Sequence, residues 1–266
     1  GARESTLALL EAGRIQVLVG THSLLQERIA FSDLGLVVVD EQHRFGVEQR
    51  ARLASKGASG ERAHLLVMSA TPIPRSLALT VYGDLESSRI DELPPGRPPI
   101  ATKACFTKPQ KKQALSRFMQ AVFGDAKGFV IVPLIDADQE RMSLETAIDY
   151  LRRQYPDVAM GAVHGRMPAR ERQDVLDAFA AGNIRVLVAT TVVEVGMDIP
   201  DANHMIILEA DRFGLAQLHQ LRGRIGRRSA QSAECFLFAG PSPTPEGRQR
   251  LQWMEKTRNG FELAEA

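Results

Sequence analysis

Short apolar segments alternate along the chain with longer stretches in which apolar residues recur every three or four positions. Uncharged runs rich in Val, Ile and Leu are typical of strands that are buried on both faces of a parallel sheet. The alternation of such strands with helices predicts an α/β fold. Eight strands are expected, at residues 15–19, 36–39, 65–68, 129–132, 158–163, 186–188, 205–208 and 235–238.

Two of the intervening stretches carry helical periodicity. Residues 143–154 and 170–181 place apolar side chains three or four positions apart, which predicts a helix with one buried face in each.

A proline-rich segment divides the chain. Residues 92–99 hold four prolines and one glycine, and such a segment continues neither a helix nor a central strand. We therefore expect a first domain over residues 1–95, a second over 96–245, and a polar, helix-like tail over 246–266. Three strands make a poor core for the first domain, so it is expected to be truncated at its N-terminus.

Composition excludes several classes of protein. With 266 residues, 44% hydrophobic and 24% charged, the chain is neither disordered nor fibrous. Its apolar runs are too short to cross a bilayer, no signal peptide is visible, and the two cysteines are expected to be reduced thiols of a cytoplasmic protein. The net charge of +1 means that any binding of nucleic acid must come from local patches.

The first chemically informative segment is an acidic pair. Asp40 and Glu41 follow the apolar run at 36–39, and Gln42 and His43 come next. Ligands of doubly wound sheets bind at the carboxyl ends of strands. Adjacent carboxylates suit nucleotide hydrolysis there, because one can hold Mg²⁺ through water and the other can polarise the attacking water. A solvated acidic pair at an ordinary strand end is the alternative.

Two further segments bear on the same chemistry. Ser69 and Thr71 follow another apolar run, where their hydroxyls could sense the nucleotide, although a turn before Pro72 explains them equally well. Residues 222–228 hold four arginines and two glycines. Such arginines can stabilise the charge that develops in phosphoryl transfer, and a basic surface loop is the alternative.

In this order the segments resemble the motifs of superfamily 2 helicases and translocases, whose core is two RecA-like domains with ATP bound between them. The similar segments are residues 20–22, a DNA-contacting turn; 40–43, the DExH box; 69–71, motif III; 163–167, the segment after motif IV; 190–200, motif V; and 220–227, motif VI.

The resemblance narrows to the RecG family of bacterial branched-DNA translocases at residues 40–50, 70–75, 90–97 and 215–224. It implies an ATP-dependent DNA helicase that acts on stalled forks and Holliday junctions in recombination and repair. It also implies a monomer that does not bind a membrane. The transcription-repair factor Mfd shares the later motifs and is an alternative family. An RNA helicase of the same superfamily is compatible with the motor motifs alone.

The resemblance also implies roles for single residues. Asp40 is expected to coordinate Mg²⁺ through water, and Glu41 to act as general base beside ATP. The residues expected to take part in catalysis are Asp40, Glu41, His43, Gln220, Arg224 and Arg227, and Gly196 and Asp198 are expected to add contacts to ATP. The residues expected to couple ATP hydrolysis to movement on DNA are Ser69, Thr71 and Glu194. Contacts with the DNA backbone are expected from Thr21, His22, His164, Gly165 and Thr190. A buried structural role suits His164 equally well, and His64 and His204 match no motif and are expected to pack.

The sequence departs from the family at its phosphate-binding loop. No Gly-x-x-x-x-Gly-Lys-Ser/Thr segment occurs before Gly20, and the family's wedge domain is also absent. Residues 259–266 resemble the entry to the family's C-terminal translocation element. The expectation is a motor fragment that alone hydrolyses ATP negligibly, and the alternative is a non-catalytic module that binds DNA or a partner.

Overall fold

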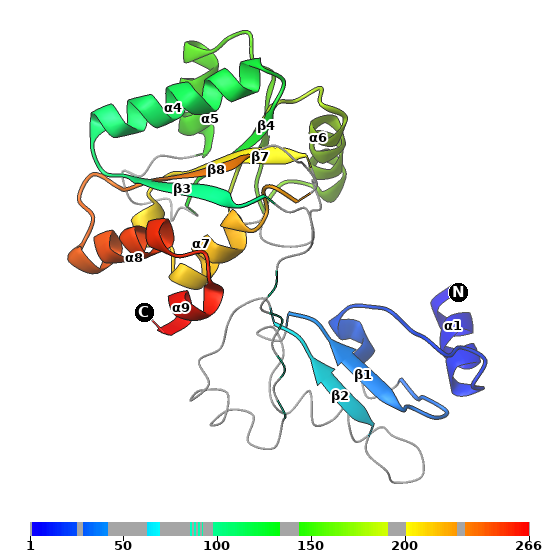
Figure 1. Cartoon of the computed structure of the whole chain (residues 1–266). Helices are drawn as coiled ribbons and strands as arrows, with labels where there is room; N and C mark the ends of the chain where they lie inside the picture. The colour runs from blue at the N-terminus through cyan, green and yellow to red at the C-terminus, as the bar shows by residue number, and fades with distance from the viewer. Residues whose placement is uncertain are drawn as a thin grey trace. The chain divides into compact units, whose positions relative to one another are not determined.

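The structure, a computed structural model, describes residues 2–25, 29–41, 63–69, 86, 88, 90, 92, 98–133, 144–190, 201–227 and 232–265. The chain divides into two compact units, residues 1–70 and residues 71–266 (Figure 1). The domain boundary expected at residues 95 and 96 lies outside the described residues. Each unit is described by itself.

Unit 1 contains two parallel strands that pair in register. The elements are α1 (Ala2–Glu11), η1 (His22–Leu25), β1 (Leu36–Val39) and β2 (His64–Val67). Leu36 pairs with His64, and Val39 pairs with Val67. Val37 and Val39 are buried on one face, which confirms the strand expected at 36–39.

Two expectations for unit 1 are wrong. Residues 15–19 form no strand, and Val17 and Val19 are 79% and 90% exposed. In the described part of unit 1, β1 and β2 pair only with each other. An apolar run becomes a strand only where a neighbour satisfies its backbone, and 15–19 has none there. His64 does not pack either, because it lies exposed at the start of β2.

Unit 2 contains a six-stranded sheet in which every pair is parallel. The spatial order is β3-β8-β7-β4-β6-β5. The strands are β3 (Ile100–Cys105), β4 (Lys127–Ile131), β5 (Met160–Val163), β6 (Val186–Ala189), β7 (Ala202–Ile207) and β8 (Ala233–Phe238). The predicted α/β class is confirmed.

Strand β3 was not expected from the sequence. Its residues read Ile-Ala-Thr-Lys-Ala-Cys, so a polar pair interrupts the apolar run. The strand lies at the edge of the sheet, and its first residues alternate between half-buried and exposed. An edge strand can carry side chains that reach water, and a continuous apolar run is therefore not required there.

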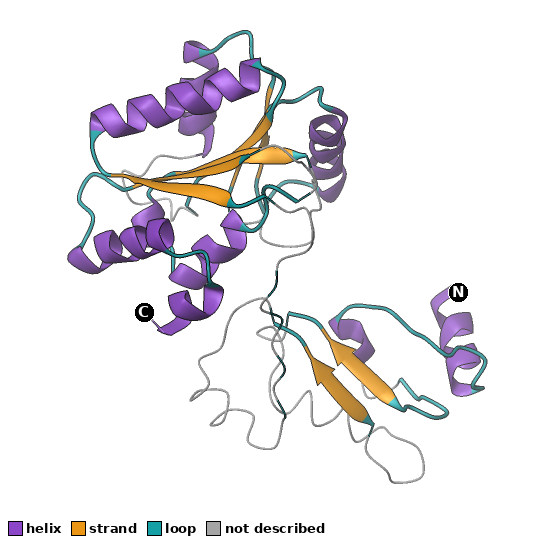
Figure 2. Cartoon of the chain, in the orientation of Figure 1, coloured by secondary structure: helices purple, strands orange, loops and turns teal. Residues whose placement is uncertain are grey.

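Helices cover both faces of this sheet, as expected. One face carries α4 (Lys108–Phe123) and α5 (Leu144–Gln154). The other carries α6 (Ala169–Ala181), α7 (Leu215–Arg222), α8 (Pro245–Lys256) and α9 (Gly260–Glu265). Figure 2 shows the orange strands between these two helical layers. Neighbouring residues such as Ile206 and Ile207 enter opposite cores, because side chains alternate along a strand.

Both cysteines are free and buried, which confirms the expectation of thiols without a disulfide. Burial raises the pKa of Cys235 to about 12. The thiol therefore stays protonated at neutral pH.

His204 packs inside unit 2, as expected. Its ring meets Phe118 edge-on at 6.4 Å between centroids. Its Nε2 lies 3.8 Å from Oε2 of Glu234, which accepts a hydrogen bond of 2.9 Å from Nε of Arg117. Its Nδ1 is buried and has no hydrogen-bond partner in the described part of the chain. Burial lowers the pKa of His204; Glu234 opposes this shift, and Arg117 adds to it.

This environment predicts a pH-dependent stability. Below the ordinary pKa of 6.5, the unfolded chain binds a proton at His204 that the folded chain does not. The free energy of unfolding should therefore fall between pH 7.5 and 5.5, at no more than about 1.4 kcal/mol per pH unit from this group. In urea titrations at both pH values, His204→Gln should lose less stability than the wild type. His64→Gln, at the exposed histidine, is the control and should keep the wild-type dependence. Equal losses in His204→Gln and wild type would refute the prediction.

Candidate functional site

In unit 1, the pairing of two strands brings the acidic pair beside Ser69. The backbone N–H of Met68 donates to the carbonyl of Val39 at 2.8 Å, which extends the ladder past the strand ends. Asp40 and Glu41 follow β1 directly, and Ser69 lies two residues beyond β2. The carboxyl edge of this sheet therefore carries two carboxylates and a hydroxyl.

The turn at the acidic pair is strained. Glu41 has a φ of 51°, in the left-handed region that residues other than glycine rarely adopt. Its N–H donates to Oδ1 of Asp40 at 2.8 Å. Such a backbone costs about 1–3 kcal/mol and is concentrated at functional sites. The surrounding structure must hold this turn in place.

The two carboxylates lie in different surroundings. Asp40 is exposed, and Glu41 is half-buried. An exposed carboxylate suits Mg²⁺, which prefers oxygen ligands and keeps several of its waters. The arrangement therefore fits a hydrated metal at Asp40 and proton transfer at Glu41.

Thr21 lies at a tight turn in the same unit. Its carbonyl accepts from the N–H of Leu24 at 3.0 Å, and its exposed hydroxyl lies 3.2 Å from Oγ of Ser23. A Cβ at Gly20 would come within 2.9 Å of the Leu24 side chain, which would have to shift to admit a larger residue. His22 begins η1.

In unit 2, three predicted DNA contacts gather at the carboxyl ends of two neighbouring strands. His164 and Gly165 follow β5, and Thr190 follows β6. The N–H of Thr190 donates to the carbonyl of Val163 at 3.3 Å. His164 is half-buried and Gly165 is exposed, so this histidine is not a fully buried structural one. Oγ1 of Thr190 is buried and makes no hydrogen bond within the described residues.

The arginine-rich segment lies at the other end of the same sheet, where the strands begin. After β7, α7 runs back toward the start of the strands and carries Gln220. The N–H of Gly226 donates to the carbonyl of Ala202, the first residue of β7, at 3.0 Å. With φ at 65° and a Cβ position 2.9 Å from that of Ala233, this position admits only glycine. Arg224 and Arg227, on either side of it, are half-buried.

Arg222 does not belong to the exposed basic cluster expected at 222–228. It is 3% exposed. Its Nη1 donates to the carbonyls of Met254 at 2.9 Å and Thr257 at 3.0 Å. Its Nη2 donates to the carbonyl of Arg258 at 3.4 Å and lies 3.1 Å from Nδ1 of His219, which must accept because a guanidinium only donates. Arg222 therefore stabilises the turn between α8 and α9, which we call the elbow, and its guanidinium is not available to a phosphate.

The other predicted site residues lie outside the described residues: His43, Thr71, Glu194, Gly196 and Asp198.

Comparison with known proteins places the chain among helicases. Residues 1–80 match the DEAD/DEAH box helicase family, and residues 110–229 match the helicase conserved C-terminal domain. The ATP-dependent DNA helicase RecG of Acidithiobacillus ferridurans is 47% identical over 264 residues, which cover 98% of this chain and 38% of that protein. The protein of the same name from Pasteurella multocida is 46% identical over 268 residues, covering 99% of this chain and 38% of the relative.

Solved structures agree with these relatives. A RecG bound to a three-way DNA junction matches with a TM-score of 0.75 and 41% identity, over 99% of this chain and 34% of that chain. Dbp5 of S. cerevisiae, bound to RNA and ADP BeF3, matches with a TM-score of 0.59 and 17% identity, over 90% of this chain and 61% of that one. The second match shows the fold alone.

Proposed function

Because this chain belongs to the RecG family of helicases and spans about two fifths of the length of its curated relatives, we propose that it is the motor region of an ATP-dependent branched-DNA translocase. The observation that carries the proposal is the strained Asp40–Glu41 turn at the carboxyl end of β1. At this turn the strain coincides with two adjacent carboxylates and the hydroxyl of Ser69 at one end of the strands, which together favour a functional site over a solvated acidic pair.

At this turn the two carboxylates divide the work. Asp40 would hold Mg²⁺ through its waters, and Glu41 would accept a proton from the water that attacks the γ-phosphate. The bound Mg²⁺ supplies positive charge that offsets the charge of the phosphates. Ser69, with His43 and Thr71, transmits the state of the nucleotide toward the DNA.

The arginine-rich edge of unit 2 supplies the complementary charge. Gln220, Arg224 and Arg227 contact the phosphates, and the arginines stabilise the charge of the transferring phosphoryl group. Gly196 and Asp198 add contacts to ATP, and Glu194 links them to the DNA.

The residues at the carboxyl ends of the strands of unit 2 are the proposed DNA contacts. His164, Gly165 and Thr190, with Thr21 and His22 of unit 1, contact the phosphate backbone, which carries no sequence information. A phosphate oxygen at Oγ1 of Thr190 would satisfy a hydroxyl that lacks a partner in the described part of the chain.

The cellular role follows the relatives. We place the protein in fork reversal and Holliday-junction processing during DNA recombination and repair, as a cytoplasmic monomer. No helix in the described ranges is long and apolar enough to span a membrane.

The proposal is tested by ATP hydrolysis with different nucleic acids. The test uses a longer polypeptide in which a segment with a phosphate-binding loop precedes residues 1–266. This polypeptide should hydrolyse ATP faster with fork DNA than with linear duplex. RNA of matched structure should not stimulate its ATP hydrolysis. A polypeptide of residues 1–266 alone contains no such loop and should stay near the background rate. Equal stimulation by RNA would favour an RNA helicase. DNA-stimulated turnover by residues 1–266 alone would contradict the role given to the loop.

A further inference from the structure

Helix α4 and the strand before it carry an unusual concentration of positive charge. Residues 98–124 contain five lysines and arginines and no aspartate or glutamate, in a chain whose net charge is +1. None of these residues belongs to the motifs identified in the sequence. A search for acid-free stretches would have revealed them.

Two cations of α4 already have structural partners. Nζ of Lys111 donates to the carbonyl of Ala239 at 2.5 Å. Arg117 forms an ion pair with both carboxylate oxygens of Glu234, and its own side chain stays 67% exposed. These two residues tie α4 to β8 and to the segment after it.

Three cations remain available, which we call the α4 strip: Lys103, Lys108 and Lys112. All three are exposed, and their ammonium groups form no ion pair or hydrogen bond with another described residue. Lys108 and Lys112 are four residues apart and so share a face of α4. Lys103 lies two residues before Cys105, which packs into the core under α4, so alternation along β3 places Lys103 on that face of the sheet.

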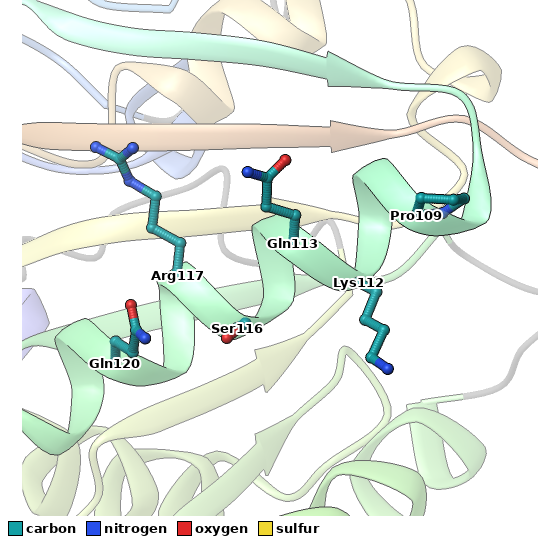
Figure 3. A pocket seen from close by; sticks show the side chains of 6 residues that line it. All are labelled: Pro109, Lys112, Gln113, Ser116, Arg117 and Gln120. Carbon is teal, nitrogen blue, oxygen red and sulfur yellow. The ribbon is translucent and has the colours of Figure 1, made fainter.

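Beside the strip, α4 bears a shallow, open depression of about 550 Å³ (Figure 3). In Figure 3, Gln113 and Arg117 extend to one side of the helix and Lys112 to the other. The lining residues are Pro109, Lys112, Gln113, Ser116, Arg117 and Gln120. They offer ammonium, guanidinium, amide and hydroxyl donors, and neither a carboxylate nor an aromatic ring.

We propose that the α4 strip, with the donors of this depression, is a second contact surface for the phosphate backbone of DNA. The proposal rests on the proposed function, because it adds a contact for the same DNA. Cations beside neutral donors suit phosphate oxygens. A peptide or a membrane surface would also require apolar side chains to be buried, and the depression offers none beyond Pro109.

The size of the surface fits a short stretch of backbone. From residue 109 to residue 120 the helix rises by about 16 Å, at about 1.5 Å per residue. Successive phosphates of one strand lie about 3.4 Å apart along the duplex axis, so about five of them match this length. The two helix lysines, Lys108 and Lys112, are four residues apart and so about 6 Å apart along the axis, which matches about two successive phosphates.

The test measures duplex-DNA affinity of the full chain as a function of salt. Each lost phosphate contact lowers the slope of log K against log [salt] by about 0.9. The triple variant Lys103→Gln, Lys108→Gln, Lys112→Gln should therefore show a slope smaller by about two to three, and an affinity at 0.1 M salt that is at least about tenfold weaker.

A matched triple variant controls for net charge. Arg14→Gln, Arg153→Gln, Lys256→Gln removes three exposed cations from other parts of the chain and should keep the wild-type slope. Equal slopes in the two triple variants would overturn the α4 surface and leave the proposed function standing. A wild-type chain that binds no duplex DNA would overturn both. Glutamine is a good helix former, and circular dichroism should show unchanged helix content in both variants.

Discussion

Replacing Glu41 with glutamine is expected to lower DNA-stimulated ATP hydrolysis by about 10²–10⁴-fold, because the amide cannot accept the proton of the attacking water. Glutamine has nearly the shape of glutamate, and the backbone N–H that donates to Asp40 stays in place. The strained turn should therefore survive. The measurement is the rate of phosphate release at saturating ATP and DNA, in a protein that joins these residues to a phosphate-binding loop.

Two controls separate chemistry from folding. Glu4→Gln changes an exposed glutamate of α1 and should leave the rate unchanged. Glu41→Gln itself should bind fork DNA with wild-type affinity, because the proposed DNA contacts lie elsewhere. A rate within a factor of two or so of the wild type would exclude Glu41 as the general base, and the acidic pair would then be left with metal binding alone.

Replacing Arg222 with methionine is expected to lower the free energy of unfolding of unit 2 by about 3–5 kcal/mol, because several buried acceptors lose their donor together. The methionine fills part of the space but leaves the carbonyls of Met254, Thr257 and Arg258 without the guanidinium that they bond. A buried acceptor left without its partner costs about 1–3 kcal/mol. Lysine at position 222 should restore little, because one ammonium cannot reproduce the planar fork.

The single tryptophan of the chain reports on this elbow. Trp253 lies in α8, and its carbonyl accepts from the N–H of Thr257 at 3.0 Å. Urea unfolding followed by its fluorescence should therefore show the loss of stability. Arg153→Met, at an exposed arginine of α5, should change the free energy of unfolding by no more than about 0.5 kcal/mol. A wild-type midpoint in Arg222→Met would mean that the elbow does not need this arginine.

Arg222 also illustrates what residue spacing cannot reveal. In sequence it stands two positions before Arg224 and is indistinguishable from a phosphate-binding arginine. Only the packing of α8 and α9 over α7 decides that its guanidinium turns inward. Those contacts join residues more than thirty positions apart, and local pattern carries no information about them.

The fold was predictable where one physical rule dominated. The interior strands of unit 2 are buried on both faces and were found from their continuous apolar runs. The rule failed where strand formation depends on a neighbouring strand. Residues 15–19 are mostly apolar but form no strand, and β3 is partly polar but pairs with β8. The position of the Asp40–Glu41 pair at the end of a strand was predictable, but its left-handed backbone was not, because strain is held in place by tertiary structure.

His164 and Thr190 lie at the carboxyl ends of the strands of unit 2, and Arg224 and Arg227 lie near the ends where the strands begin, so under the proposed function the sheet would connect the ATP contacts to the DNA contacts. The six residues of β7 span about 20 Å along the strand direction. A sheet packed on both faces turns as one stiff body. A rotation of about 10° about one end moves the other by about 3.5 Å, close to the rise of about 3.4 Å per base pair. In the proposed function, a tilt of this size at the arginines would therefore correspond to a step of one base pair at the proposed DNA contacts.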